Sequence, residues 1–151
     1  MDIQRLRPEY YEELYMLMLD ECFPDVPTTF EQACAYLNEA VIYGLFQDEK
    51  LVGAFIFGDV CDDSAFFDMV CHTSQKGRWA TRKTIRKIID IAFNQLKLQF
   101  IWAQPKNTAS LKAALKSGFV FVQDTMEQEH PILILSRHNL NKKYLIKTGA
   151  H

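Results

Sequence analysis

Two neighbouring runs of apolar residues constrain the fold of this chain more than any other feature of its sequence. The runs are Val41–Gln47 and Leu51–Phe57, rich in Val, Ile, Phe and Tyr, and polar residues 48–50 separate them. Residues of these types are enriched in strands, and a short polar break between two such runs is typical of a β-hairpin. The chain is therefore expected to build an antiparallel sheet.

Further helices and strands are expected on both sides of this hairpin. Before it, the sequence predicts a helix from Pro8 to about residue 21 and a second helix that starts at a Thr28–Glu31 capping box. After it, we expect a strand over 65–71, a helix over 76–96, a strand over 98–103, a helix over 108–116 ended by Gly118, and strands over 119–123 and 132–135. The prediction is one α/β domain over residues 1–151, with a basic tail over 137–151.

Composition excludes several classes of protein. A chain with 13 % aromatic and 48 % hydrophobic residues is too apolar for a disordered protein. No apolar run approaches the roughly 18 residues that span a bilayer, and the N-terminus lacks the apolar segment of a signal peptide. The cysteines are spaced too widely for a CxxC pair: Cys22, Cys34, Cys61 and Cys71. We expect a cytoplasmic protein with no membrane segment, whose thiols are reduced and mostly buried.

The charges are distributed unevenly along the chain. Residues 1–70 contain fifteen acidic and three basic side chains, whereas residues 71–151 contain four acidic and fourteen basic ones. This split indicates either a cleft with oppositely charged walls or a basic surface for a polyanion, unless folding intermixes the two halves. The basic segments 76–87 and 137–147 permit nucleic-acid binding, but the pI of about 6.1 and the acidic half argue against it.

The junction between the third predicted strand and the long helix is a candidate anion site. A loop that contains Gly77 and leads into a helix presents free backbone N–H groups, and the helix dipole favours negative charge there. Lys76, Arg78 and Arg82 add positive charge, so a diphosphate is the natural occupant. The alternative interpretation is an ordinary strand–helix turn with a solvated basic face.

The order of elements and three local features resemble the GNAT superfamily of acyl-CoA N-acyltransferases. The features are Lys50-Leu51-Val52-Gly53 as a turn and strand, Val70–Ala80 as the strand-to-helix loop, and Asn107 followed eleven residues on by Gly118-Phe119. The resemblance implies a central, mostly antiparallel sheet flanked by helices, and acetyl-CoA as acyl donor without a metal. It implies these cofactor-binding residues: Val70, Cys71, Gln75, Lys76, Gly77, Arg78, Trp79, Ala80, Thr81, Asn107 and Ser110.

Two departures from the family pattern stand out. The family's loop signature is [Q/R]-x-x-G-x-[G/A]. If Gln75 fills the first position, Arg78 stands where the family has glycine; in the shifted frame Gly77 fits, but Trp79 fills the last small position. The family often has a tyrosine seven residues after the Asn as a general acid, and here that position is Ala114. Loss of the acid need not abolish activity, because acid–base assistance is typically worth about 10²–10⁴-fold.

The candidate catalytic residues lie at the end of the third strand. Asp68 is the first choice for a general base, since it interrupts an apolar strand and a buried unpaired charge is costly. His72 is the second choice, because its ordinary pKa suits a base. The alternatives are a solvated strand face for Asp68 and plain polar surface for His72. Glu127 and Glu129 are candidates to hold a cationic amine.

Other chemistries find little support in the sequence. Cys71 and His72 are adjacent in a strand and so point to opposite faces, which argues against a thiol nucleophile with its base. Cys61, Cys71 and His72 lack metal-ligand spacing, and no phosphate-binding loop of nucleotide hydrolases is present. We expect an N-acetyltransferase that acts on a primary, cationic amine, or alternatively an acyl-CoA-binding module without turnover. The oligomeric state, a homodimer included, stays open.

Overall fold

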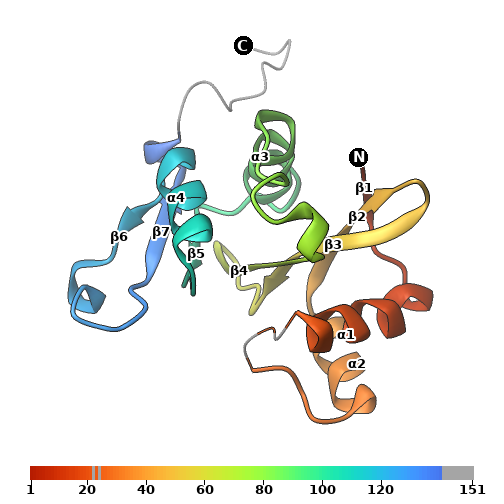
Figure 1. Cartoon of the computed structure of the whole chain (residues 1–151). Helices are drawn as coiled ribbons and strands as arrows, with labels where there is room; N and C mark the ends of the chain where they lie inside the picture. The colour runs from red at the N-terminus through yellow and green to blue at the C-terminus, as the bar shows by residue number, and fades with distance from the viewer. Residues whose placement is uncertain (22, 24, 141–151) are drawn as a thin grey trace. The chain divides into compact units, whose positions relative to one another are not determined.

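The computed structural model describes residues 1–21, 23 and 25–140 (Figure 1). The chain divides into two compact units. The first unit contains residues 1–60 and 67–79; the second contains residues 61–66 and those from 80 onward. Strand β4 (Ser64–Cys71) contributes residues to both units.

The predicted hairpin is confirmed and lies in the first unit. Strand β2 (Val41–Gln47) pairs antiparallel with β3 (Lys50–Gly58), and β1 (Asp2–Arg5) pairs antiparallel with β2. The turn contains two residues, Asp48 and Glu49, with φ of 51° and 66°. Two consecutive positive φ values are those of a type I′ turn, whose twist matches that of the flanking strands.

The two helices of the first unit begin in different ways. A 3₁₀ turn, η1 (Pro8–Tyr10), leads into α1 (Tyr11–Asp20), and α2 (Phe30–Glu39) follows. The expected capping box is wrong by one residue: the hydroxyl of Thr29, not Thr28, accepts the N–H of Gln32 at 3.1 Å. Thr28 instead donates its hydroxyl to the side-chain oxygen of Gln32.

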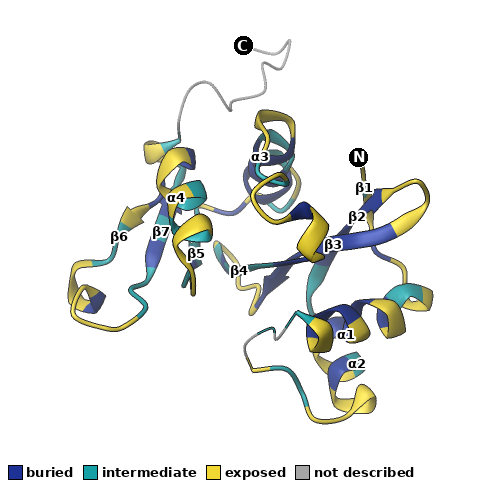
Figure 2. Cartoon of the chain, viewed as in Figure 1, coloured by how far each residue is buried: buried dark blue, intermediate teal, exposed yellow. Residues whose placement is uncertain are grey.

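One face of the strands in the first unit packs against α1 and α2. Figure 2 shows that both helices are buried on one side and exposed on the other. The buried side supplies Leu14, Met18 and Leu37 to a shared core. The strands contribute Ile42, Ala54, Ile56 and Val70 to the same cluster.

The second unit contains the remaining strands. The residues Ser64–Phe66 of β4 pair in parallel with β5 (Phe100–Ala103). Strand β7 (Leu133–Ser136) pairs antiparallel with β5 and with the short strand β6 (Val120–Phe121). The strands follow the order β1-β2-β3-β4-β5-β7-β6. A mixed, mostly antiparallel sheet flanked by helices is therefore confirmed.

The long helix differs from the prediction at both ends. It begins at Arg82 rather than at residue 76, because the hydroxyl of Thr81 accepts the N–H of Thr84 and so caps the helix there. Helix α3 (Arg82–Ile89) continues as a π-helical segment, η3 (Asp90–Gln95). The carbonyls of Phe93 and Leu98 accept hydrogen bonds from the guanidinium of Arg137, which lies over the Phe93 ring.

The last part of the described chain follows the prediction more closely. Helix α4 (Thr108–Ser117) ends at Gly118, whose φ of 108° is the left-handed cap that was expected. Only Val120–Phe121 of the strand expected over 119–123 form a strand, β6. The chain enters a 3₁₀ turn, η4 (Gln123–Thr125), one residue after it. Of the basic tail, residues 137–140 are described and include the 3₁₀ turn η5 (Arg137–Asn139); residues 141–151 lie outside the described part.

The cysteines are more exposed than the sequence predicts. Cys71 is buried, Cys34 is half-buried and Cys61 is exposed, all three as free thiols, while Cys22 lies outside the described residues. Cys61 is exposed because it falls in the loop before β4 and not in a strand or helix.

Candidate functional site

Strand β4 presents alternate residues to two different faces. Val70, 4 % exposed, belongs to the core with α1 and α2. Phe67 points to the other face, where its ring centroid lies 6.2 Å from that of Phe55. The ring centroid of Trp79 lies 6.4 Å from that of the same Phe55. Trp79 packs on this face and is half-buried.

Cys71 and His72 at the end of this strand do not form a nucleophile–base pair. Burial raises the pKa of the Cys71 thiol, which disfavours the reactive thiolate. His72 is exposed and lies beyond the strand. Its Nδ1 accepts the Ser74 N–H at 3.1 Å and lies 2.9 Å from the Ser74 hydroxyl, so the imidazole caps the turn that follows.

That turn, η2 (Thr73–Gln75), is held at its base by hydrogen bonds to β3 and β2. The His72 N–H donates to the Val52 carbonyl at 2.8 Å. The side chain of Gln75, 7 % exposed, donates to the side-chain oxygen of Gln47 on β2 at 2.7 Å. The side chain of Gln75 is therefore engaged within the protein.

Gly77 lies in the hydrogen-bonded loop that continues η2, and residues 73–79 together are called the turn from here on. It has a φ of +78°, it is exposed, and a Cβ built on it would meet no atom within 4 Å. The amides of Lys76, Arg78 and Trp79 donate to carbonyls within the turn, whereas the Gly77 N–H has no acceptor among the described residues. A side chain of ordinary chirality is strained at this φ, so glycine is the residue that suits the position.

Glu21 binds the turn from the end of α1. Its carboxylate accepts the N–H of Thr73 at 3.0 Å and the hydroxyl of Thr73 at 3.0 Å. The ammonium of Lys76 lies 3.0 Å from the other carboxylate oxygen. These hydrogen bonds hold the pKa of the Glu21 carboxyl below its ordinary value, and the one from Lys76 contributes most.

The other predicted cofactor residues lie in the second unit. Ala80 and Thr81 precede α3, and the first-turn amides of a helix lack intrahelical acceptors. Asn107 caps α4, because its side-chain oxygen accepts the Ser110 N–H at 2.8 Å. The methyl side chain of Ala114 has no acidic proton and so cannot act as a general acid. The nearby hydroxyl of Ser117 donates to the carbonyl of Ala113 at 2.7 Å at the end of the helix.

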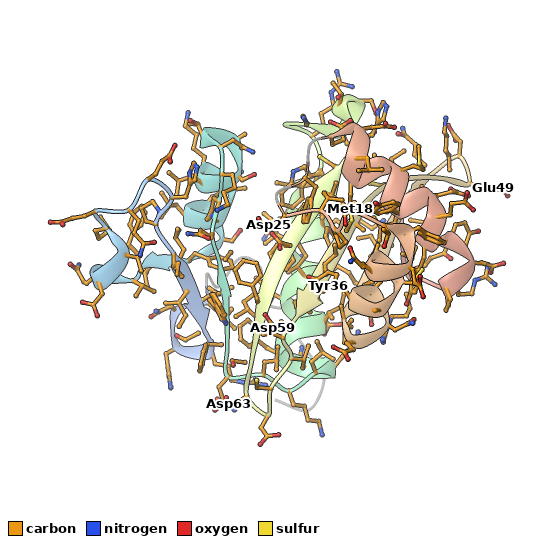
Figure 3. The ribbon with its side chains drawn as sticks, turned by 90° about the horizontal axis from the view of Figure 1, so that it is seen from below. Met18, Asp25, Tyr36, Glu49, Asp59 and Asp63 are labelled. Carbon is orange, nitrogen blue, oxygen red and sulfur yellow. The ribbon has the colours of Figure 1, made fainter. Side chains whose placement is uncertain are left out.

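Asp68 lies on the same face of β4 as Val70 and is half-buried. Tyr36, on α2, approaches this region: a Cβ built at Gly58 would lie 2.9 Å from its hydroxyl oxygen. Burial first, and then the negative charges of Asp68 and Asp59, raise the pKa of Tyr36 to about 12 (Figure 3 labels Tyr36 and Asp59). Tyr36 therefore keeps its phenolic proton at neutral pH.

Sequence reasoning did not identify Tyr36 or Glu21 as site residues. Tyr36 lies outside the apolar stripe of its helix, and Glu21 is one of many acids in the first half of the chain. No motif marks either residue. Only the folded chain brings Tyr36 near Asp68, and Glu21 next to the Thr73–Lys76 segment. The candidate acceptor residues Glu127 and Glu129 are exposed in the second unit.

Two kinds of feature are absent from the described residues: a cluster of metal ligands and a membrane-spanning helix. Among residues 1–21, 23 and 25–140, no three His, Cys, Asp or Glu side chains gather closely enough to hold a metal ion. Within the same described part of the chain, every helix is too short or too polar to traverse a lipid bilayer.

No family model and no curated protein matches the sequence, but solved structures match the fold. Spermidine N-acetyltransferase from Vibrio cholerae, in a dodecameric structure, matches with a TM-score of 0.70 and 14 % identity, over 90 % of this chain and 93 % of that one. The N-acetyltransferase PseH from Campylobacter jejuni, in complex with acetyl coenzyme A, matches with a TM-score of 0.65 and 18 % identity, over 90 % and 98 %.

A third match is the ribosomal-protein-S5-alanine acetyltransferase from Vibrio fischeri. Its TM-score is 0.70 and its identity 14 %, over 92 % of this chain and 94 % of that one. This chain therefore shares, over nearly its whole length, a fold found in acetyltransferases with different acceptors.

Proposed function

We propose that this chain, which has the fold of the GNAT superfamily, is an N-acetyltransferase that transfers an acetyl group from acetyl-CoA to a primary amine. The observation that carries the proposal is the turn at Gly77. Along the chain, this turn follows the end of a strand and precedes a capped helix, in a chain with this fold. One of the proteins with the same fold is a complex with acetyl coenzyme A.

The residues of the turn fit a diphosphate group. The open space at Gly77 admits a ligand close to the backbone, and its N–H is a donor without an acceptor in the described chain. Arg78 is exposed in the same turn and supplies positive charge. Charged hydrogen bonds from amides and guanidinium groups to phosphate oxygens are stronger than neutral ones. When bound, acetyl-CoA supplies the acetyl group as a thioester.

Asp68 is the general base in this proposal. An aliphatic amine is protonated at neutral pH, so it must lose a proton before it can attack a carbonyl carbon. Asp68 lies on β4, the strand that leads into the cofactor turn, and faces the α1–α2 side. His72 suits this role less well, because its Nδ1 already caps the turn.

The acceptor is a cationic amine in this proposal. Asp59 and Asp68 both lie close enough to Tyr36 to raise its pKa, so negative charge accumulates in this region of the first unit. The phenolic oxygen of Tyr36 and the two carboxylates are suited to accept hydrogen bonds from an ammonium group. A structural neighbour is named for its action on spermidine, which is a polycationic amine.

Ala114 supports a second candidate function. A chain that lacks the family's usual acid at this position could bind an acyl-CoA without transferring the acyl group. Release of free thiol from acetyl-CoA, measured with a panel of polyamines, aminoglycosides and peptides, distinguishes the two candidates. Steady release of free thiol with one class of acceptor supports the acetyltransferase. If acetyl-CoA binds but no acceptor of the panel causes thiol release, the acyl-CoA-binding module is supported.

Thermal unfolding in the presence of acetyl-CoA tests the binding step that both functions share. Ligand at a hundred times its Kd adds about 2.7 kcal/mol of stability. For a chain of this length, that corresponds to a rise of roughly 5–11 °C in Tm. No rise in Tm at millimolar acetyl-CoA would refute both functions.

A further inference from the structure

Only 10 % of the Glu21 side chain is exposed, although Glu21 directly follows the last residue of α1. It binds three donors of the turn: the N–H and the hydroxyl of Thr73 and the ammonium of Lys76. These donors come from the segment directly before Gly77. Glu21 thus holds the first half of the turn.

The position of this carboxylate is unfavourable from charge alone. A diphosphate at the Gly77 end of the turn would be repelled by a negative charge on the neighbouring segment. A lysine in direct contact with the diphosphate would also do better without a carboxylate 3.0 Å from its ammonium. The arrangement is understandable if Glu21 acts on the shape of the turn and not on the ligand.

We propose that Glu21 is a positioning residue that fixes the Thr73–Lys76 segment, and that Lys76 is the partner of Glu21 rather than of the cofactor diphosphate. This inference rests on the proposed function for its consequence, which is affinity for coenzyme A. The Gln75–Gln47 hydrogen bond fastens the same segment from β2. With its base held from α1 and from β2, the turn keeps Gly77 exposed at its positive φ.

Calorimetric titration with coenzyme A tests the consequence. Glu21→Gln, which removes the ion pair, is expected to weaken binding about tenfold, equivalent to about 1.4 kcal/mol. Lys76→Met should weaken binding to a similar extent, and the double variant should be no worse than either single one, because both lose the same pair. Glu13→Gln, an exposed acid of the same helix, serves as the control with the same change of charge.

The sign of the Glu21→Gln effect decides between the two roles of Lys76. If Lys76 binds the diphosphate directly, removal of the competing carboxylate should tighten coenzyme A binding. Tighter or unchanged binding by Glu21→Gln, with weaker binding by Lys76→Met, would overturn the proposal. Additive losses in the double variant would overturn it as well.

Amide hydrogen exchange without ligand separates failure of this inference from failure of the proposed function. The Thr73 N–H is expected to exchange at least about tenfold faster in Glu21→Ala than in the wild type, since its acceptor is lost. Unchanged protection of Thr73 would refute the positioning role even if coenzyme A binds. If the wild type binds no coenzyme A while Thr73 protection falls as expected, the positioning role stands and the proposed function fails.

Discussion

Replacement of Gly77 by alanine isolates the backbone conformation on which the cofactor turn depends. A Cβ at this position meets nothing within 4 Å, so the change introduces no steric clash. The φ of +78° is nevertheless strained for alanine, at a cost of about 1–2 kcal/mol. For a chain of this length, the expected fall in Tm is roughly 2–8 °C. If the turn relaxes to avoid this strain, the direction of the Gly77 amide changes.

Acetyl-CoA affinity should fall more than stability alone explains. We expect the Kd of Gly77→Ala, measured by calorimetry below the unfolding transition, to rise at least about tenfold, or about 1.4 kcal/mol. Gly118→Ala is the matched control, because Gly118 also has a positive φ, 108°, but ends α4. This control should lose a similar amount of stability and keep its acetyl-CoA affinity within about twofold, less than 0.5 kcal/mol.

Either of two results would refute the reasoning. Equal losses of affinity in Gly77→Ala and Gly118→Ala would show that the effect is general destabilisation. Unchanged stability and affinity in Gly77→Ala would show that the turn does not require a left-handed residue.

Three further changes test other parts of the structure. Asp68→Asn should lower kcat by about 10²–10⁴-fold, with little change in the KM for acetyl-CoA; an unchanged kcat with an accepted amine would exclude Asp68 as the base. The pKa of Tyr36 is raised to about 12, so its contribution to stability is present below pH 10 and is lost as the pH rises towards 12. Alkaline unfolding curves should therefore show this loss in the wild type but not in Tyr36→Phe. Thr29→Ala should cost about 1 kcal/mol in denaturant unfolding and Thr28→Ala much less, because Thr29 caps α2.

Local patterns in the sequence were sufficient to predict most of the elements. The hairpin formed where β-branched and aromatic runs flank a polar break, and α4 ended at Gly118 as expected. These features depend on residues close together in the chain, so short-range propensities decide them. The extent of the long helix, α3, was predicted less well. Apolar periodicity starts early there, but Thr81 offers a cap and Gly77 adopts a positive φ, and both delay the helix.

The candidate site was predicted only in part. The turn around Gly77 was identified from its glycine and cations, and the structure adds which of its groups are already engaged, namely the side chain of Gln75 and the ammonium of Lys76. The roles assigned to Asp68, Asn107 and the residues of the turn stay predictions. Tyr36 and Glu21 were not identified, because no spacing rule links a residue of α1 or α2 to one near β4.

The sequence by itself determined the hairpin and the glycine turn, since apolar runs, turn residues and glycine act on their immediate neighbours. Tertiary structure alone decided which charges meet. Glu21 and Thr73 are 52 residues apart in the chain, yet the packing of α1 on the strands brings their side chains to 3.0 Å. Long-range pairs of this kind follow from how whole faces pack, and no local pattern specifies them.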